Sequence, residues 1–262
     1  MPLRFCFLVT VLVCFTLFDA QGTHSAASAD TMPFRPAMET APMGDFFRDD
    51  FDGPALIPEW SWINEDASSW SLTERPGYLR IHTQPGTLDE ANNSAHNVLL
   101  RAAPPAPYVL STRFELHPTQ EFHEAGLLVY QDADNYVKLS RLYSTRLPSE
   151  GDDFYLLNQE VAGVRSGAIY VPTSQQAIEL QLLVEATNVT GAYRDASGRW
   201  ITLGTLNVGA LASSASVGIL ANNGISSPPA LSIPVDFDFV TVGAPPLHMY
   251  LPLVSRQAEP GR

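Results

Sequence analysis

The chain has 262 residues, a formal net charge of −13 and a pI near 4.7. Because nucleic-acid binding needs a basic surface, this charge argues against a nucleic-acid partner, and it also argues against long-range attraction to anionic membranes. Hydrophobic residues make up 45% of the chain, which is enough for the core of one large all-β domain.

The first 29 residues have the features of a cleavable secretory signal peptide. Arg4 gives a positively charged start, and residues 5–18 form an apolar run that is shorter than the roughly 20 residues of a membrane-spanning helix. The small residues Ala27-Ser28-Ala29 provide a cleavage site. We therefore predict a secreted protein whose mature form has no membrane span; an uncleaved signal anchor is the alternative.

The rest of the chain divides into a linker, one folded domain and a tail. Residues 30–44 are rich in Pro, Ala, Met and Thr without periodicity, which predicts a disordered linker. Residues 45–243 hold the predicted domain, and residues 244–262 form a Pro-containing tail. Both cysteines, Cys6 and Cys14, lie in the predicted signal peptide, so the mature protein would have no disulfide or cysteine metal site.

Short apolar or alternating segments follow one another through the predicted domain, separated by turn-forming residues. We predict strands near residues 45–51, 60–63, 69–72, 78–81, 97–102, 108–116, 124–131, 136–142, 153–159, 163–171, 177–186, 189–194, 199–203, 216–221 and 235–242. Residues 85–96 are polar and indicate a loop, and helical periodicity is confined to a possible turn near 206–212. This pattern predicts an all-β fold, a two-sheet antiparallel β-sandwich of the jelly-roll type.

The stretch Glu124–Leu142, EAGLLVYQDADNYVKLSRL, indicates a β-hairpin whose turn lies at residues 132–135. Asp and Asn favour turns because their side chains bond to nearby backbone. If Tyr130 and Tyr136 face each other, the period of two assigns both faces of the hairpin. The apolar face then comprises Leu127, Val129, Val137 and Leu139. The aromatic and polar face comprises Leu128, Tyr130, Tyr136, Lys138 and Ser140.

Several short motifs occur in a fixed order along residues 45–243. They are Asp50-Phe51-Asp52, Trp60-Ser61-Trp62, Gly77–Ile81, Ala125–Gln131, Asn135–Val137, Val217–Leu220 and Asp236–Val240. Together the motifs resemble the concanavalin A-like domain at the C-terminus of family 43 β-xylosidases. The resemblance implies a concanavalin A-like jelly roll with a glycan-related accessory role. In those xylosidases the sandwich follows a catalytic propeller, for which this sequence has no room, so no catalytic residue is carried over.

Sandwich folds of this type often hold a structural calcium ion where the first and last strands meet. Calcium prefers carboxylate and carbonyl oxygens, and aspartates stand at both ends of the predicted domain. We predict Asp52 and Asp238 as calcium ligands. The alternative is that these aspartates cap turns or face water.

Catalytic motifs are absent from the sequence. The Glu-x-Asp-x-x-Glu strand of jelly-roll glucanases, the His-Glu-x-x-His zinc motif and Gly-x-Ser-x-Gly do not occur. We therefore predict no catalytic residues. If the protein were an enzyme, a glycosidase-type hydrolase or a polysaccharide lyase acting on the concave sheet would be the expected class.

Aromatic and polar residues together suit carbohydrate, because sugar rings stack on aromatic side chains and their hydroxyls need polar partners. The predicted carbohydrate-binding residues are Tyr130, Tyr136, Lys138, Arg113 and Glu115, which would share one outward face if their strands were adjacent. The sequence therefore predicts an exported, non-catalytic, lectin-like module for a plant or microbial polysaccharide or oligosaccharide. Besides the enzyme, a structural or adhesive cell-surface module is the alternative.

Overall fold

The computed structural model describes residues 45–146, 152–209 and 215–246. The predicted signal peptide, the linker and most of the tail lie outside this range. Within the described residues, no helix is long and apolar enough to cross a membrane.

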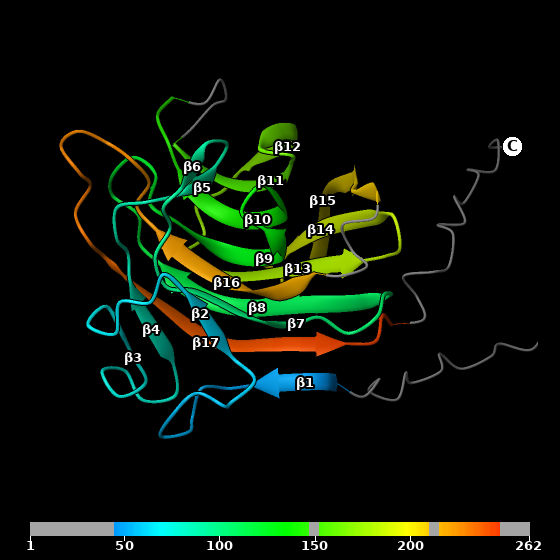
Figure 1. The fold of residues 1–262 in the computed structure, drawn as a ribbon, viewed down its shortest axis with the longest axis horizontal. Coiled ribbons are helices and arrows are strands. Elements are labelled where there is room, and N and C mark those ends of the chain that lie inside the picture. The colour runs from blue at the N-terminus through cyan, green and yellow to red at the C-terminus, as the bar shows by residue number, and fades with distance from the viewer. Residues whose placement is uncertain (1–44, 147–151, 210–214, 247–262) are drawn as a thin grey trace, which may run out of the picture. The chain divides into compact units, whose positions relative to one another are not determined.

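Two antiparallel sheets pack face to face (Figure 1). Sheet A has the order β15 (Trp200–Asn207), β14 (Asn188–Arg194), β13 (Ala177–Val184), β8 (Tyr108–Leu116), β17 (Pro234–Gly243), β4 (Leu79–His82) and β3 (Trp70–Ser71), with β1 (Asp45–Asp49) also paired to β17. Sheet B has the order β12 (Val164–Pro172), β11 (Asp153–Val161), β10 (Asn135–Tyr143), β9 (Glu124–Asp132), β16 (Ser216–Asn222), β7 (Val98–Ala102) and β2 (Ser61–Ile63). The predicted two-sheet antiparallel sandwich is confirmed.

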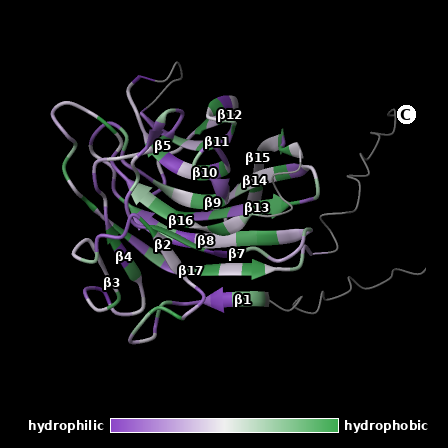
Figure 2. Ribbon diagram, viewed as in Figure 1, coloured by the Kyte–Doolittle hydropathy of each residue, from purple (hydrophilic) through white to green (hydrophobic). Residues whose placement is uncertain are grey.

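The main core lies between the two sheets and follows the period of two along the strands. In β13, Ile178, Leu180, Leu182 and Val184 are fully buried, and the residues between them are at least partly exposed. Hydrophobic and hydrophilic bands accordingly alternate along many strands in Figure 2. Because every second side chain of a strand points to the same face, this alternation sets which face each strand buries.

The predicted hairpin forms the middle of sheet B. Tyr130 pairs with Tyr136 as expected, and the four residues of its predicted apolar face are all fully buried in the main core. Asp132 closes the turn, because its Oδ1 accepts hydrogen bonds from the Asp134 backbone N–H at 2.9 Å and from Asn135 Nδ2 at 2.8 Å.

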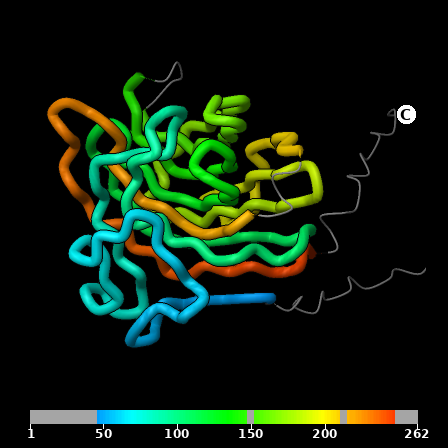
Figure 3. The backbone as a smooth tube through the Cα atoms, in the orientation of Figure 1, coloured from blue at the N-terminus to red at the C-terminus, as the bar shows by residue number. Residues whose placement is uncertain are grey.

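The segment between β4 and β7 crosses from sheet A to sheet B and folds over the outer face of sheet B (Figure 3). It carries a two-stranded hairpin, β5 (Leu88–Asp89) and β6 (Asn92–Asn93), within the residues predicted to form a loop. A second apolar cluster lies beneath this hairpin. It comprises Leu88, Ala95, Val98, Leu100, Leu128, Tyr136 and Leu220. The β5–β6 hairpin therefore covers part of the outer face of β9 and β10, which the sequence predicts to be an open surface.

A cluster of charged residues lies on the outer face of sheet A. Asp236 Oδ1 is 2.6 Å from Arg80 Nε, and Asp236 Oδ2 is 2.7 Å from Arg75 Nη1. Arg75 also binds both carboxylate oxygens of Glu115, at 2.9 and 3.0 Å. Burial alone would raise the pKa of Asp236, but the hydrogen bonds from Arg80 and Arg75 outweigh it and hold this pKa below its ordinary value.

Replacing Asp236 with Asn should destabilise the fold by about 1.5–3 kcal/mol at pH 7, the usual value of hydrogen bonds to a charged group. Since the folded-state pKa is depressed, this stabilisation is complete above the unfolded pKa of about 3.9 and is lost as the pH falls through the folded value. Urea denaturation of both proteins from pH 7 to pH 3 should show the difference shrinking below about pH 4. An equal difference at pH 7 and pH 3 would contradict this account. The exposed Asp52, replaced with Asn, serves as the control.

Candidate functional site

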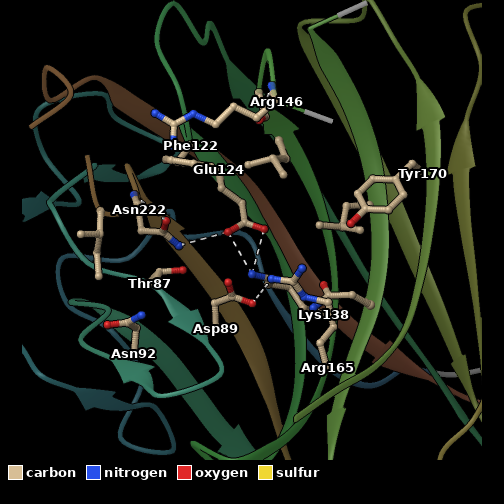
Figure 4. A pocket seen from close by; sticks show the side chains of 16 residues that line it. Thr87, Asp89, Asn92, Phe122, Glu124, Lys138, Arg146, Arg165, Tyr170 and Asn222 are labelled. Carbon is tan, nitrogen blue, oxygen red and sulfur yellow. Dashed lines mark hydrogen bonds and ion pairs between the residues drawn. The ribbon is translucent and has the colours of Figure 1, made fainter. Parts of the chain in front are cut away.

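A cleft of about 270 Å³ lies on the outer face of sheet B (Figure 4). Its floor is formed by outward-facing residues of β9, β10, β11 and β16, and β12 supplies one side. The β5–β6 hairpin, the loop before β9, the segment after β10 and the loop after β16 supply the rim. Figure 4 shows side chains from these separate parts of the chain pointing toward a common space.

A buried ion pair forms the centre of the floor. Lys138 Nζ lies 3.0 Å from each carboxylate oxygen of Glu124, and both side chains are almost fully buried. Ser140 Oγ donates a hydrogen bond to Glu124 Oε1 at 2.7 Å, and Asn222 Nδ2 lies 3.4 Å from Glu124 Oε2. Buried charges are tolerated when they are paired and hydrogen-bonded in this way. The floor is polar and has a fixed geometry.

Aromatic side chains stand on opposite sides of this floor (Figure 4). Tyr170 of the edge strand β12 packs edge-to-face with Phe154, with ring centroids 6.4 Å apart. Phe122 stands across the cleft, and the guanidinium of Arg146 lies 5.3 Å from its ring centroid. Because a sugar ring presents C–H groups on its faces, half-buried aromatic walls around a polar floor suit a carbohydrate.

Phe122 is held in an unusual backbone conformation, with a φ of 66°. The loop after β16 approaches Phe122 closely, because a Cβ at Gly224 would overlap the Cβ of Phe122, and Gly224 itself has a φ of 63°. Strained non-glycine residues of this kind are concentrated at ligand sites.

His123 fixes the loop that carries Phe122. Its Nδ1 accepts hydrogen bonds from the backbone N–H groups of Thr119 and Gln120, at 3.1 and 3.3 Å. The proton is therefore on Nε2, which donates to the Leu231 carbonyl at 2.8 Å. Burial lowers the pKa of His123, which keeps the ring neutral and preserves these three bonds. The loops before β9 and after β16 are thus tied together at the rim.

One acceptor at the cleft has no hydrogen-bond partner among the described residues. Asn158 lines the cleft and is 2% exposed, and its Oδ1 is buried and unpaired. Buried acceptors are nearly always hydrogen-bonded in native proteins. The partner of this acceptor therefore does not come from the described residues.

The β5–β6 hairpin is anchored to sheet B beside the cleft. The Tyr136 hydroxyl lies 2.7 Å from the Leu88 carbonyl and 2.9 Å from Glu160 Oε2, and the Glu90 N–H donates to the same carboxylate oxygen at 2.7 Å. Burial, together with the neighbouring Glu160, raises the pKa of Tyr136, so the hydroxyl keeps its proton. The hairpin is therefore a fixed wall of the cleft.

The structure separates the predicted carbohydrate-binding residues. Lys138 lines the cleft, Tyr136 is completely buried under the β5–β6 hairpin, and Tyr130 packs against the cluster beneath that hairpin. The expectation that Arg113 and Glu115 share a face with the tyrosines is wrong, because β8 pairs with β13 and β17 in sheet A. A direct role of these five residues in sugar binding stays a prediction.

The predicted calcium ligands lie near a real junction, since β1 and β17 pair as the first and last strands of the sandwich. However, Asp238 forms an ion pair with Arg113, and Asp236 is bound by two arginines. Among the described residues, no group of three or more His, Cys, Asp and Glu side chains could hold a metal ion. Asp236 and Asp238 are thus already engaged by arginine side chains. Calcium binding at Asp52 and Asp238 stays a prediction of the sequence and forms no part of the function proposed below.

The walls of the cleft were not predicted from the sequence. Tyr170 occupies an outward position of a predicted strand, so the period of two could have placed it opposite the floor once the pairing of β10, β11 and β12 was known. Phe122 and Arg146 stand outside the strands, where no periodicity assigns a direction. Polar residues within otherwise apolar strands, such as Glu124 and Asn158, were the available signal.

Residues 48–241 match the family described as Beta xylosidase C-terminal Concanavalin A-like domain. A stretch of 94 residues is 36% identical to the non-reducing end α-L-arabinofuranosidase BoGH43B of Bacteroides ovatus, and it covers 35% of this chain and 17% of that protein. The structure is similar to the GH43 BlXynB protein from Bacillus licheniformis, with a TM-score of 0.66 and 26% identity over 75% of this chain and 39% of that chain.

The structure is also similar to part of a xylan β-1,4-xylosidase from Bacillus halodurans, with a TM-score of 0.61 and 22% identity over 82% of this chain and 41% of that chain. The chain thus spans less than half the length of each of these relatives. The predicted concanavalin A-like fold is confirmed. Because the family match extends over nearly all of the sandwich, the chain belongs to the family of β-xylosidase C-terminal concanavalin A-like domains.

Proposed function

We propose that this protein binds carbohydrate, without cleaving it, in the cleft on the outer face of sheet B. The observation that carries the proposal is the pairing of aromatic walls at Tyr170 and Phe122 with a buried polar floor at Glu124 and Lys138. Glycan sites combine such surfaces because a sugar has both apolar ring faces and hydroxyl groups. The predicted signal peptide supports an exported protein that meets its ligand outside the cell.

The relatives suggest the class of glycan. Two of them are named as an arabinofuranosidase and a xylan β-1,4-xylosidase, and this chain corresponds to a part of each. We infer that the ligand is a plant cell-wall polysaccharide, or an oligosaccharide from one, that contains xylose or arabinose.

A non-catalytic role is supported by the state of the carboxylates at the cleft. The described residues that line it include two, Asp89 and Glu124, and each forms an ion pair, with Arg165 and Lys138 respectively. Glycoside hydrolysis needs one carboxyl group that can donate a proton and a second that acts as base or nucleophile. Both carboxylates at the cleft are instead already paired with a cation of the protein.

The first prediction from this proposal concerns sugar binding. On a glycan array the protein should bind xylose- or arabinose-containing oligosaccharides, and Tyr170→Ala should weaken that binding at least tenfold, a loss of about 1.4 kcal/mol. The reason is the loss of a stacking wall. Phe46→Ala, which removes an aromatic ring that is 58% exposed on β1, is the matched control and should bind normally. Binding that survives Tyr170→Ala unchanged would place the ligand elsewhere.

The second prediction concerns catalysis. Incubation with a panel of xylans and arabinoxylans should release no reducing ends and no unsaturated sugars above the level of a heat-treated control. Product formation that Glu124→Gln abolishes would instead establish a hydrolase or lyase.

The third prediction concerns the floor. Lys138→Met should destabilise the protein by about 3–5 kcal/mol in urea denaturation, because it leaves the Glu124 carboxylate buried without its cation. The double variant Lys138→Met with Glu124→Leu should destabilise the protein clearly less than Lys138→Met alone, since no buried charge remains. Equal losses in the single and double variants would contradict the view that the pair is a buried structural element.

A further inference from the structure

The cleft crosses the strands of sheet B from β12 toward β16, and it is closed at the β16 end by backbone. The Gly86 N–H donates a hydrogen bond to the Gly224 carbonyl at 2.9 Å, and these two residues form an isolated β-bridge. Beside them the Asn223 N–H donates to the Gln84 carbonyl at 3.0 Å. The stem of the β5–β6 hairpin is thus joined directly to the loop after β16.

The cleft does not continue beyond this junction over the described part of sheet B. Leu88 and Ala95 of the hairpin segment pack on Leu100 of β7 and Leu220 of β16. All four side chains are nearly completely buried. The outer face beyond the cleft is therefore occupied by the protein's own side chains.

A second closure lies along the hairpin side of the cleft. Asp89 of β5 forms an ion pair with Arg165 of β12, and Figure 4 shows this pair along one side of the space. The hairpin is therefore attached on one side of the cleft to the loop after β16 and on the other side to β12.

We propose that the cleft is a blind pocket that takes the terminal one or two sugars of a glycan chain or branch, and not the interior of a linear chain. This inference rests on the carbohydrate binding proposed above. A linear polymer lying across the sheet would have to pass through the Gly86–Gly224 bridge. The cleft has a volume of about 270 Å³, just below the usual range of about 300–1,000 Å³ for small-molecule pockets. This small volume agrees with a site for one or two sugars.

The test uses the whole protein and linear β-1,4-xylo-oligosaccharides from xylobiose to xylohexaose, with affinities measured by calorimetry. A blind pocket predicts dissociation constants that agree within about twofold along the series. It also predicts that a bulky group on one chain end abolishes binding of xylohexaose, whereas the same group on the other end has no effect. An affinity that rises tenfold or more with chain length, and that tolerates blocking at both ends, would overturn the inference.

A pair of variants tests the closed end directly. Ile225 lines the cleft next to the bridge and is 52% exposed, so Ile225→Trp should fill this end without disturbing the core. Binding of every member of the series should then fall at least tenfold. Ser232→Trp, at an exposed residue of the same loop, is the control and should leave binding unchanged. Xylohexaose that binds Ile225→Trp normally would contradict a blind end.

The two proposals fail in different ways. If neither the array nor the xylo-oligosaccharides show any binding, the carbohydrate-binding function itself fails. If the oligosaccharides bind with affinities that grow with length, carbohydrate binding stands and only the blind pocket is lost.

Discussion

The attachment of the β5–β6 hairpin to the outer face of sheet B is the contact on which the site depends. Without it, sheet B would present a broad open surface. The hairpin buries Leu88 and Ala95 against β7 and β16, and the Tyr136 hydroxyl and the Glu160 carboxylate hold its backbone. One polar segment thereby both completes a second apolar cluster and turns the sheet face into a walled cleft.

Strands form the floor of the cleft, and loops form much of its rim. The strands β9 and β10 supply a rigid floor, because the Glu124–Lys138 pair is buried and further hydrogen-bonded by Ser140. The rim is supplied by loops that are fixed by specific contacts, such as the neutral His123 ring and the close approach of Gly224 to Phe122. The strands thus fix the polar surface of the floor, and the loops hold the aromatic wall at Phe122 above it.

Local pattern was sufficient for the strands of the two main sheets, for their buried faces and for the register of the central hairpin. The alternation in Ile178–Val184 and the Asp132 turn are encoded within a few residues of sequence. Strand partners far apart in the chain are not encoded in this way. Nothing near Arg113 indicates that β17, more than a hundred residues later, is its neighbour, so the tyrosines and Arg113 were placed together incorrectly. The hairpin cover was missed for the same reason, since residues 85–96 are locally polar and their few apolar side chains act only through distant partners.

Chemical-shift mapping of the folded protein during titration with xylobiose tests the central claim most directly. The account predicts that the largest changes occur at the backbone amides of Lys138, Asn158, Tyr170 and Asn222, around the cleft of sheet B. The amides of Arg113 and Glu115 on sheet A should not shift. Changes confined to sheet A, with the cleft residues unaffected, would contradict it.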